Sequence, residues 1–172
     1  CSSDLSKNGF AYAGEDDGSH IWVVDVKKQK LVTTIPLSGV PEFVAYDSKT
    51  NRIYQNIKTK DTVAVINPET NKVEYEWSTL PATGPHGLAV NTKTGRLFIA
   101  GHNGKLVELD IKTGKFISQV EIAPGTDQIS VDDSNGIIYC ASKGFISAVK
   151  ETESGLTLLG DTPTMPGAHT LS

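Results

Sequence analysis

Residues 85–91 read PHGLAVN, and the segments 41–47 (PEFVAYD) and 126–132 (TDQISVD) align with them position by position. These copies begin at positions 41, 85 and 126, so the sequence repeats at intervals of 41 to 44 residues. Two partial copies extend the series, at residues 1–6 (CSSDLS) and 168–172 (AHTLS). Internal similarity with this period indicates a repeat protein, in which each repeat is one supersecondary unit.

Each copy is followed by the same succession of turns and apolar segments. A polar turn closed by Gly or Asn comes first, as in residues 91–95 (NTKTG), because the closing position usually needs a positive φ. A second strand (96–99), a third strand (106–110) and a more polar fourth strand (116–120) then follow. Equivalent second strands are 10–13, 52–55 and 137–140, and equivalent third strands are 21–25, 63–67 and 146–150. No stretch shows helical periodicity, so every repeat predicts four short strands joined by hairpin turns.

Four short antiparallel strands that repeat about every 42 residues are what a β-propeller blade requires. We therefore predict an all-β propeller segment with four blades of four antiparallel strands each. The blades are expected at approximately 1–40, 41–84, 85–125 and 126–167, and residues 168–172 would begin the next blade. Because neither end offers an outer strand that could close a ring, we expect a piece of a larger propeller of roughly seven or eight blades. The remaining blades would come from lost sequence or from another chain.

Length and composition restrict the class of protein. A chain of 172 residues can form one domain with a buried core, and 38% apolar and 21% charged residues are typical of a soluble globular protein. The net charge of −4 disfavours a nucleic acid as partner, because such binding depends on Lys and Arg at phosphates. The longest apolar stretches, such as 21–24 (IWVV), have the length of a strand, so we predict no membrane span.

The two cysteines, Cys1 and Cys140, form neither a disulfide framework nor a metal knuckle, because they lie far apart in the sequence. Cys140 belongs to an apolar run and is expected to be a buried, inert thiol. Cys1 resembles the start of a mature bacterial lipoprotein, but a truncation of a longer chain explains it equally well, because Cys1 also falls in register with the repeat.

The second repeat carries a specific family resemblance. Residues 62–73 (TVAVINPETNKV), preceded by 52–54 (RIY), resemble the third strand and turn of the YVTN-repeat propeller family, and residues 85–90 (PHGLAV) resemble its blade opening. Residues 109–115 (LDIKTGK) keep the pattern, whereas residues 150–152 (KET) depart from it. The resemblance implies a fold rather than an activity.

Members of that family are mostly bacterial or archaeal, and exported or attached to the cell surface. The resemblance therefore implies a periplasmic, secreted or surface-associated protein. Similar propellers include surface-layer proteins, sugar-acid lactonases, the haem-binding propeller of a nitrite reductase and a member that binds nucleic acid.

One position of the repeat carries residues that could bind a ligand. The second position of the blade opening holds Glu42, His86, Asp127 and His169, and Cys1 fits the same slot. Because the innermost strands of a propeller run beside its axis, we expect these residues to form a ring at one channel mouth. Carboxylate and imidazole groups can hold a divalent metal ion or transfer protons. The alternative is that a channel mouth is polar simply because it is wet.

The motifs G-x-S-x-G, G-x-G-x-x-G, H-E-x-x-H and C-x-x-C, and the P-loop, are absent. We therefore predict a non-catalytic binding or interaction propeller with a protein or small-molecule ligand. The first alternative is a metal- or haem-dependent enzyme of the lactonase or nitrite-reductase kind that uses the ring. The second alternative is binding of single-stranded nucleic acid, which the net charge disfavours.

The same register predicts the surroundings of several other residues. His20 and His102 lie in expected turns and are interpreted as solvated, whereas Trp22 in a third strand is expected in the core. Six apolar residues of the third repeat are expected to be buried, namely Leu88, Val90, Leu97, Ile99, Val107 and Leu109.

Overall fold

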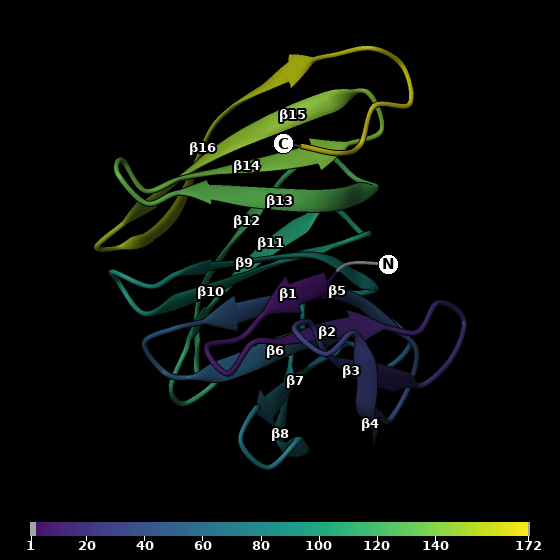
Figure 1. Cartoon of the computed structure of the whole chain (residues 1–172). Coiled ribbons are helices and arrows are strands. Elements are labelled where there is room, and N and C mark those ends of the chain that lie inside the picture. Colours follow the sequence, from purple (N-terminus) through teal and green to yellow (C-terminus); the bar gives the residue numbers. More distant parts are fainter. Residues whose placement is uncertain (1–2, 172) are drawn as a thin grey trace. The chain divides into compact units, whose positions relative to one another are not determined.

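Sixteen β-strands make up the computed structural model of the chain, which describes residues 3–171 (Figure 1). Consecutive strands pair as antiparallel neighbours and form four sheets of four strands each. The first sheet contains β1 (Ser3–Leu5), β2 (Phe10–Gly14), β3 (His20–Asp25) and β4 (Lys30–Pro36), and the second contains β5 (Pro41–Asp47), β6 (Arg52–Ile57), β7 (Thr62–Asn67) and β8 (Lys72–Ser78). The third contains β9 (Pro85–Asn91), β10 (Arg96–Gly101), β11 (Lys105–Asp110) and β12 (Phe116–Glu121), and the fourth contains β13 (Thr126–Asp132), β14 (Ile137–Ser142), β15 (Phe145–Thr152) and β16 (Gly155–Pro163). Residues 3–171 contain no helix, and the prediction of an all-β chain with four-stranded antiparallel units is confirmed.

Side chains at the ends of the first strands build the turns that follow them. The Asn91 Oδ1 atom accepts the backbone N–H of Lys93 at 3.1 Å and that of Thr94 at 3.3 Å. Asp47 forms the same kind of turn at the end of β5. Gly95 closes the turn after Asn91 with a φ of 71°, a conformation that glycine adopts without the steric cost of a Cβ atom. The polar turn of each repeat therefore has a local physical cause.

The chain divides into two compact units, Cys1–Ser78 and Thr79–Ser172. Within the first unit, the first and second sheets share a cluster of buried apolar side chains. Tyr12 is fully buried there, and its hydroxyl donates a 2.8 Å hydrogen bond to Asn71 Oδ1, which joins the two sheets. The buried residues of this cluster are Tyr12, Ile21, Val23, Ile35, Val44, Ile53 and Ile66.

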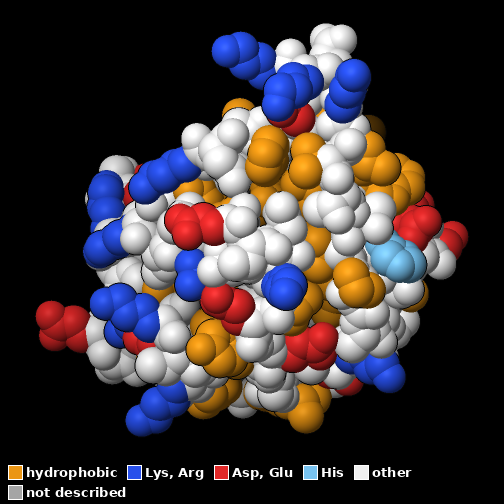
Figure 2. Space-filling model, turned by 60° about the horizontal axis from the view of Figure 1, so that its bottom comes forward, with side chains coloured by type: hydrophobic (Ala, Val, Ile, Leu, Met, Phe, Trp, Pro, Cys, Tyr) orange, Lys and Arg blue, Asp and Glu red, His pale blue; other side chains and the backbone are white. Residues whose placement is uncertain are grey.

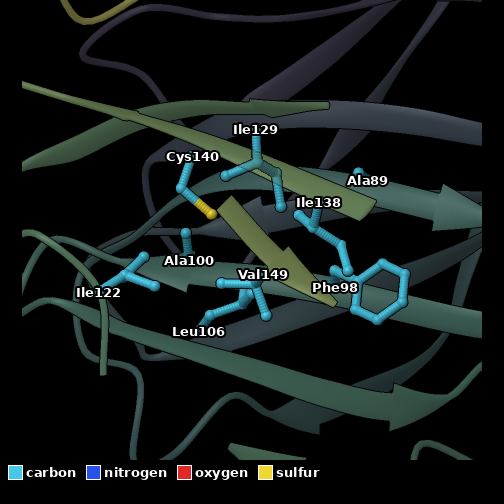
Figure 3. Packing of buried hydrophobic residues seen from close by; sticks show 9 residues of the cluster. All are labelled: Ala89, Phe98, Ala100, Leu106, Ile122, Ile129, Ile138, Cys140 and Val149. Carbon is cyan, nitrogen blue, oxygen red and sulfur yellow. The ribbon is translucent and has the colours of Figure 1, made fainter. Parts of the chain in front are cut away.

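The second unit has a corresponding core between the third and fourth sheets. Figure 3 shows its side chains converging between the strands, with Phe98 beside Ile138 and the sulfur of Cys140 directed toward Ala100. The free thiol of Cys140 is fully buried, and desolvation raises its pKa, as expected for an inert thiol. The cluster consists of Ala89, Phe98, Ala100, Leu106, Ile122, Ile129, Ile138, Cys140 and Val149.

Most of the residues expected to be buried in the third sheet are buried. Val90 is the exception, because it is only half-buried. It lies one residue from the end of β9, which is the edge strand of its sheet. The buried members of the predicted set are Leu88, Leu97, Ile99, Val107 and Leu109.

The prediction that Trp22 lies in the core is wrong, because 46% of the residue is exposed. Its neighbours in β3, Ile21 and Val23, are fully buried in the cluster of the first unit. Since successive side chains of a strand point to opposite faces, Trp22 points away from that cluster. An apolar strand therefore does not have two buried faces in this sheet.

Residues 164–171 follow β16 without forming a strand. This segment returns to the fourth sheet, where the Leu171 N–H donates to Gln128 Oε1 at 3.0 Å and the Gly144 N–H donates to the carbonyl oxygen of Ala168 at 2.9 Å. That a further blade begins at Ala168 stays a prediction, and Cys1 lies outside the described residues. No helix that could cross a membrane is found in residues 3–171.

Candidate ligand site at the strand openings

Three of the four predicted metal ligands lie at irregularities in strand pairing. In β9, the pairing with β10 shifts between Pro85 and Gly87, so His86 is an extra residue in the strand. In β13, the pairing with β14 shifts in the same way at Asp127. Glu42 lies within the corresponding irregularity of β5 in the first unit. A β-bulge turns its extra residue out of the regular alternation and commonly re-aims a side chain at a binding site.

A hydrogen bond to the backbone orients the imidazole of His86. Its Nδ1 atom lies 2.7 Å from the carbonyl oxygen of Gly84. Because a carbonyl oxygen can only accept, Nδ1 carries the proton, and the lone pair of the neutral ring lies on Nε2. A metal-binding histidine typically donates its other ring N–H to a carbonyl or carboxylate in this way.

His169 repeats this arrangement at the equivalent position of the sequence repeat. Its Nδ1 atom lies 2.6 Å from the carbonyl oxygen of Gly167, again the glycine two residues earlier. Gly84 and Gly167 have φ values of 56° and 82°, which disfavour any residue with a Cβ atom. The spacing Gly-x-His therefore places the lone pair of both neutral rings on Nε2.

Asp127 lies close to both imidazoles within the second unit. The His169 Nε2 atom is 3.8 Å from Asp127 Oδ2, and the two side chains are 52% and 40% exposed. One ring nitrogen of His86 and one carboxylate oxygen of Asp127 lie within 4.8 Å of each other. The second unit therefore brings together three residues that the repeat register selected.

The structure adds His102, which sequence reasoning interpreted as a solvated turn residue. Its side chain is exposed, but its ring centroid lies 5.2 Å from that of His86. The His102 N–H donates to the carbonyl oxygen of Gly84 at 3.0 Å, and the carbonyl oxygen of His102 accepts the Gly125 N–H at 2.9 Å. His102 is thus held between the two glycines that precede the openings of β9 and β13.

Electrostatics favour the neutral form of His102. Its pKa is lowered, first by desolvation and then by the charges of His86 and Lys143, whereas Asp127 acts in the opposite direction. A neutral imidazole is the form that binds a metal ion. In the sequence, the one signal that could have pointed to His102 is its position between Gly84 and Gly125, the glycines that precede two of the repeated strand openings.

Glu42 makes an ion pair inside the first unit. Its carboxylate lies 2.9 Å from the Lys58 ammonium group, and this contact is the largest influence that raises the pKa of Lys58. Membership of Glu42 in one ring with the other predicted ligands stays a prediction.

Imidazole nitrogens beside a carboxylate form the donor set that Zn²⁺ and similar transition-metal ions prefer. His86 and Asp127 bring a ring nitrogen and a carboxylate oxygen within 4.8 Å of each other, while His102 lies beside His86 and His169 lies beside Asp127. We call these four residues the opening cluster. The same groups can also accept or donate protons near neutral pH.

No protein-family model matches the chain, so membership in the YVTN-repeat family stays a prediction. Two curated relatives, the uncharacterized protein YncE of Salmonella typhi and that of Salmonella typhimurium, are each 25% identical to the chain over 177 residues. The match covers 99% of this chain and 50% of each relative. The chain thus spans about half the length of these curated relatives.

Solved structures share the architecture at low sequence identity. A functionally unknown protein from Desulfotomaculum acetoxidans DSM 771 superposes with a TM-score of 0.80, at 15% identity over 94% of this chain and 55% of that chain. Kuenenia stuttgartiensis hydrazine synthase gives a TM-score of 0.80, at 11% identity over 94% of this chain and 48% of that chain. The fold is that of a β-propeller.

A third propeller neighbour occurs in the structure of the Mitotic Checkpoint Complex, with a TM-score of 0.77 and 17% identity over 94% of this chain and 53% of that chain. Likeness at these identities shows the propeller fold alone, because propellers support many unrelated functions. Each four-stranded sheet is therefore a propeller blade, and the opening cluster belongs to the third and fourth blades.

Proposed function

We propose that this propeller segment is a non-catalytic binding protein that holds a divalent transition-metal ion, such as Zn²⁺, at the opening cluster. The observation that carries the proposal is the hydrogen bond that His86 and His169 each make to a glycine carbonyl oxygen. It leaves Nε2 of both neutral rings as the atom able to bind an ion. The bulges at His86 and Asp127 support it further, because they re-aim both side chains.

The distances suit an ion that draws its ligands together. Two ligands of a tetrahedral Zn²⁺ ion, each at about 2.0–2.1 Å, are separated by roughly 3.3 Å. The His169 Nε2 and Asp127 Oδ2 atoms are 3.8 Å apart, so a small rotation of either exposed side chain would suffice. Ca²⁺ and Mg²⁺ fit less well, since they prefer oxygen ligands alone.

A metal-dependent enzyme is the second candidate, and the exposure of the cluster favours it. The side chains of Asp127 and His169 are about half exposed, so an ion between them would keep positions for water or a substrate. Such open positions are typical of catalytic zinc sites. We place this candidate second because the catalytic motifs named above are absent.

We further propose an exported location, periplasmic, secreted or at the cell surface, on the basis of the family resemblance. Nucleic acid remains the last choice of ligand, given the net charge of −4. On the face drawn in Figure 2, Lys and Arg side chains lie mainly toward the upper and left edges, with Asp and Glu side chains dispersed over the same face, and the basic side chains form no uninterrupted stripe. A basic stripe is the usual footprint of nucleic-acid binding.

Calorimetric titration of the metal-free chain with Zn²⁺ tests the proposal. We expect one bound ion, and His86→Ala or Asp127→Asn should weaken the affinity by at least about tenfold, since each removes a ligand. His20→Ala is the matched control, because His20 lies in the first unit beside Glu15 and should leave the affinity unchanged. The same titration of Glu42→Gln tests the remaining predicted ligand.

Absence of Zn²⁺ binding at millimolar concentration, or equal loss in the His20→Ala control, would refute the metal site. Turnover of sugar-acid lactones by the zinc-loaded chain, abolished by His86→Ala, would instead favour the enzyme candidate.

A further inference from the structure

The second unit contains a groove of about 400 Å³ whose lining residues are distinct from those of the opening cluster. It is bounded by the end of β12, the loop that follows, the start of β15 and the middle of β16. Its walls are mainly apolar and are formed by Ile122, Pro124, Phe145 and Leu158, while two carboxylates, Glu121 and Asp161, stand at its margin.

The floor of the groove is preformed by hydrogen bonds. The Ala123 N–H donates to the buried Ser147 Oγ at 3.0 Å, and the carbonyl oxygen of Ala123 accepts the Ser142 hydroxyl at 2.9 Å. Elsewhere along the same two outer strands, the Leu156 N–H donates to Ser118 Oγ at 3.0 Å and ties β16 to β12. A partner would therefore meet a rigid surface and would not have to order it.

Two large apolar side chains of the groove are exposed to solvent. Phe145 is 45% exposed and Leu158 is 37% exposed, whereas Ile122 beneath them is only 7% exposed. Exposed apolar side chains gathered in a concave site with a polar rim are typical of interaction surfaces. The groove is thus shaped to accept a bulky apolar side chain.

The charge at the margin selects what accompanies that side chain. Glu121 is widely exposed and already attracts a cation, because its carboxylate lies 3.2 Å from the Lys105 ammonium group. Asp161 lies on β16, opposite Ser147 of β15. With Lys105 counted, these groups carry one net negative charge beside the apolar groove, which complements a Lys or Arg and repels an acidic ligand.

The strand beside the groove favours an extended ligand. β16 is the last strand of its sheet and pairs with β15 alone within that sheet. A strand edge can pair with the backbone of an extended peptide, while a pocket beside it reads one side chain.

We propose that this groove binds an extended segment of a partner protein, in which a bulky apolar residue is flanked by Lys or Arg. The site shares no residue with the opening cluster. The third and fourth blades together form the groove, because its lining residues lie on β12, β15, β16 and the loop after β12.

Selection from a random dodecapeptide library displayed on phage, with the whole chain as bait, tests this proposal. We expect an enriched motif that combines Leu, Ile, Phe or Trp with a neighbouring Lys or Arg. A synthetic peptide carrying that motif, labelled with fluorescein, should bind at least tenfold more weakly to Leu158→Asp in an anisotropy titration. The matched control is Leu159→Asp, because Leu159 is 56% exposed on the same strand but does not line the groove.

Asp161→Lys examines the charge argument, since it should weaken the same peptide and strengthen one whose basic residues are replaced by Glu. Absence of an enriched motif, an acidic motif, or equal loss in Leu158→Asp and Leu159→Asp would each overturn the proposal. A concentration-dependent dimer that Leu158→Asp abolishes would also overturn it, because the occupant would then be a second copy of the chain. Melting curves of the variants verify that these exposed substitutions leave the fold intact.

Discussion

His86 and His169 make the same hydrogen bond, each from Nδ1 to the carbonyl oxygen of the glycine two residues earlier. The two bonds measure 2.7 and 2.6 Å, although one lies in β9 and the other in the segment after β16. The repeat of the sequence is therefore also a repeat of side-chain orientation. This relationship makes the glycine a positioning residue for the proposed metal site.

Substitution of Gly167 by Ala should disturb that orientation. Gly167 has a φ of 82° and nothing lies within 4 Å of an added Cβ atom, so the substitution acts through backbone strain and not through a clash. We expect Zn²⁺ affinity to fall by about tenfold, the size of effect typical for partners that orient a ligand. Gly9→Ala is the matched control, because Gly9 has a φ of 78° and equally open surroundings in the first unit. Equal Zn²⁺ affinity of the two variants would contradict the positioning role.

Phe98→Ala should destabilise the second unit strongly. The ring is fully buried in the core between the third and fourth blades, and loss of a buried Phe side chain typically costs about 3–5 kcal/mol. Phe116→Ala provides the comparison, because Phe116 is 46% exposed on β12 and should change the free energy of unfolding much less. Urea denaturation followed by circular dichroism measures both variants, and similar losses would be inconsistent with this core.

Glu108 should make stability depend on pH. Its side chain is buried, and desolvation raises its pKa above the ordinary value, although Ser118 at 2.6 Å and Arg96 at 3.0 Å act in the opposite direction. A carboxyl group with a raised pKa in the folded state is best accommodated when protonated. The stabilisation that this carboxyl group provides is complete below its pKa in the unfolded chain. It is lost as the pH rises through its pKa in the folded protein.

Glu108→Gln removes this titration. The free energy of unfolding of the variant should therefore increase relative to that of the unmodified chain as the pH rises from acid toward neutral. Urea denaturation of both proteins across that range gives the difference. A difference that is constant with pH would show that the contacts with Ser118 and Arg96 balance desolvation, and one that moves the other way would show that they outweigh it.

Cys140 should not react with thiol reagents in the folded protein. Cys140 is fully buried, so a reagent cannot reach its sulfur. Desolvation also raises its pKa, so little of the reactive thiolate forms. In a Cys1→Ser background, Ellman's reagent should detect the thiol only after guanidinium is added. Rapid reaction without denaturant would mean that the core of the second unit opens readily.

The repeat by itself determined the strands and their order, because a strand and a turn each depend on residues that are close together in the sequence. Short apolar segments between polar turns define the strands, and Asn91 with Gly95 shows how a side-chain hydrogen bond and a positive φ define a turn. Register also selected His86, Asp127 and His169, since equivalent positions of a repeat occupy equivalent places in its blades.

Tertiary structure alone decided which side chains meet. Trp22 belongs to an apolar strand, yet it points away from the core, because burial depends on what packs against each face and not on the strand's own pattern. His102 contacts His86 because backbone hydrogen bonds hold the β10–β11 turn beside the openings of β9 and β13. The groove at Phe145 and Leu158 depends on the spacing of the outer strands of two blades. Distances between separate blades follow from bulges and packing, which a period of about 42 residues does not encode.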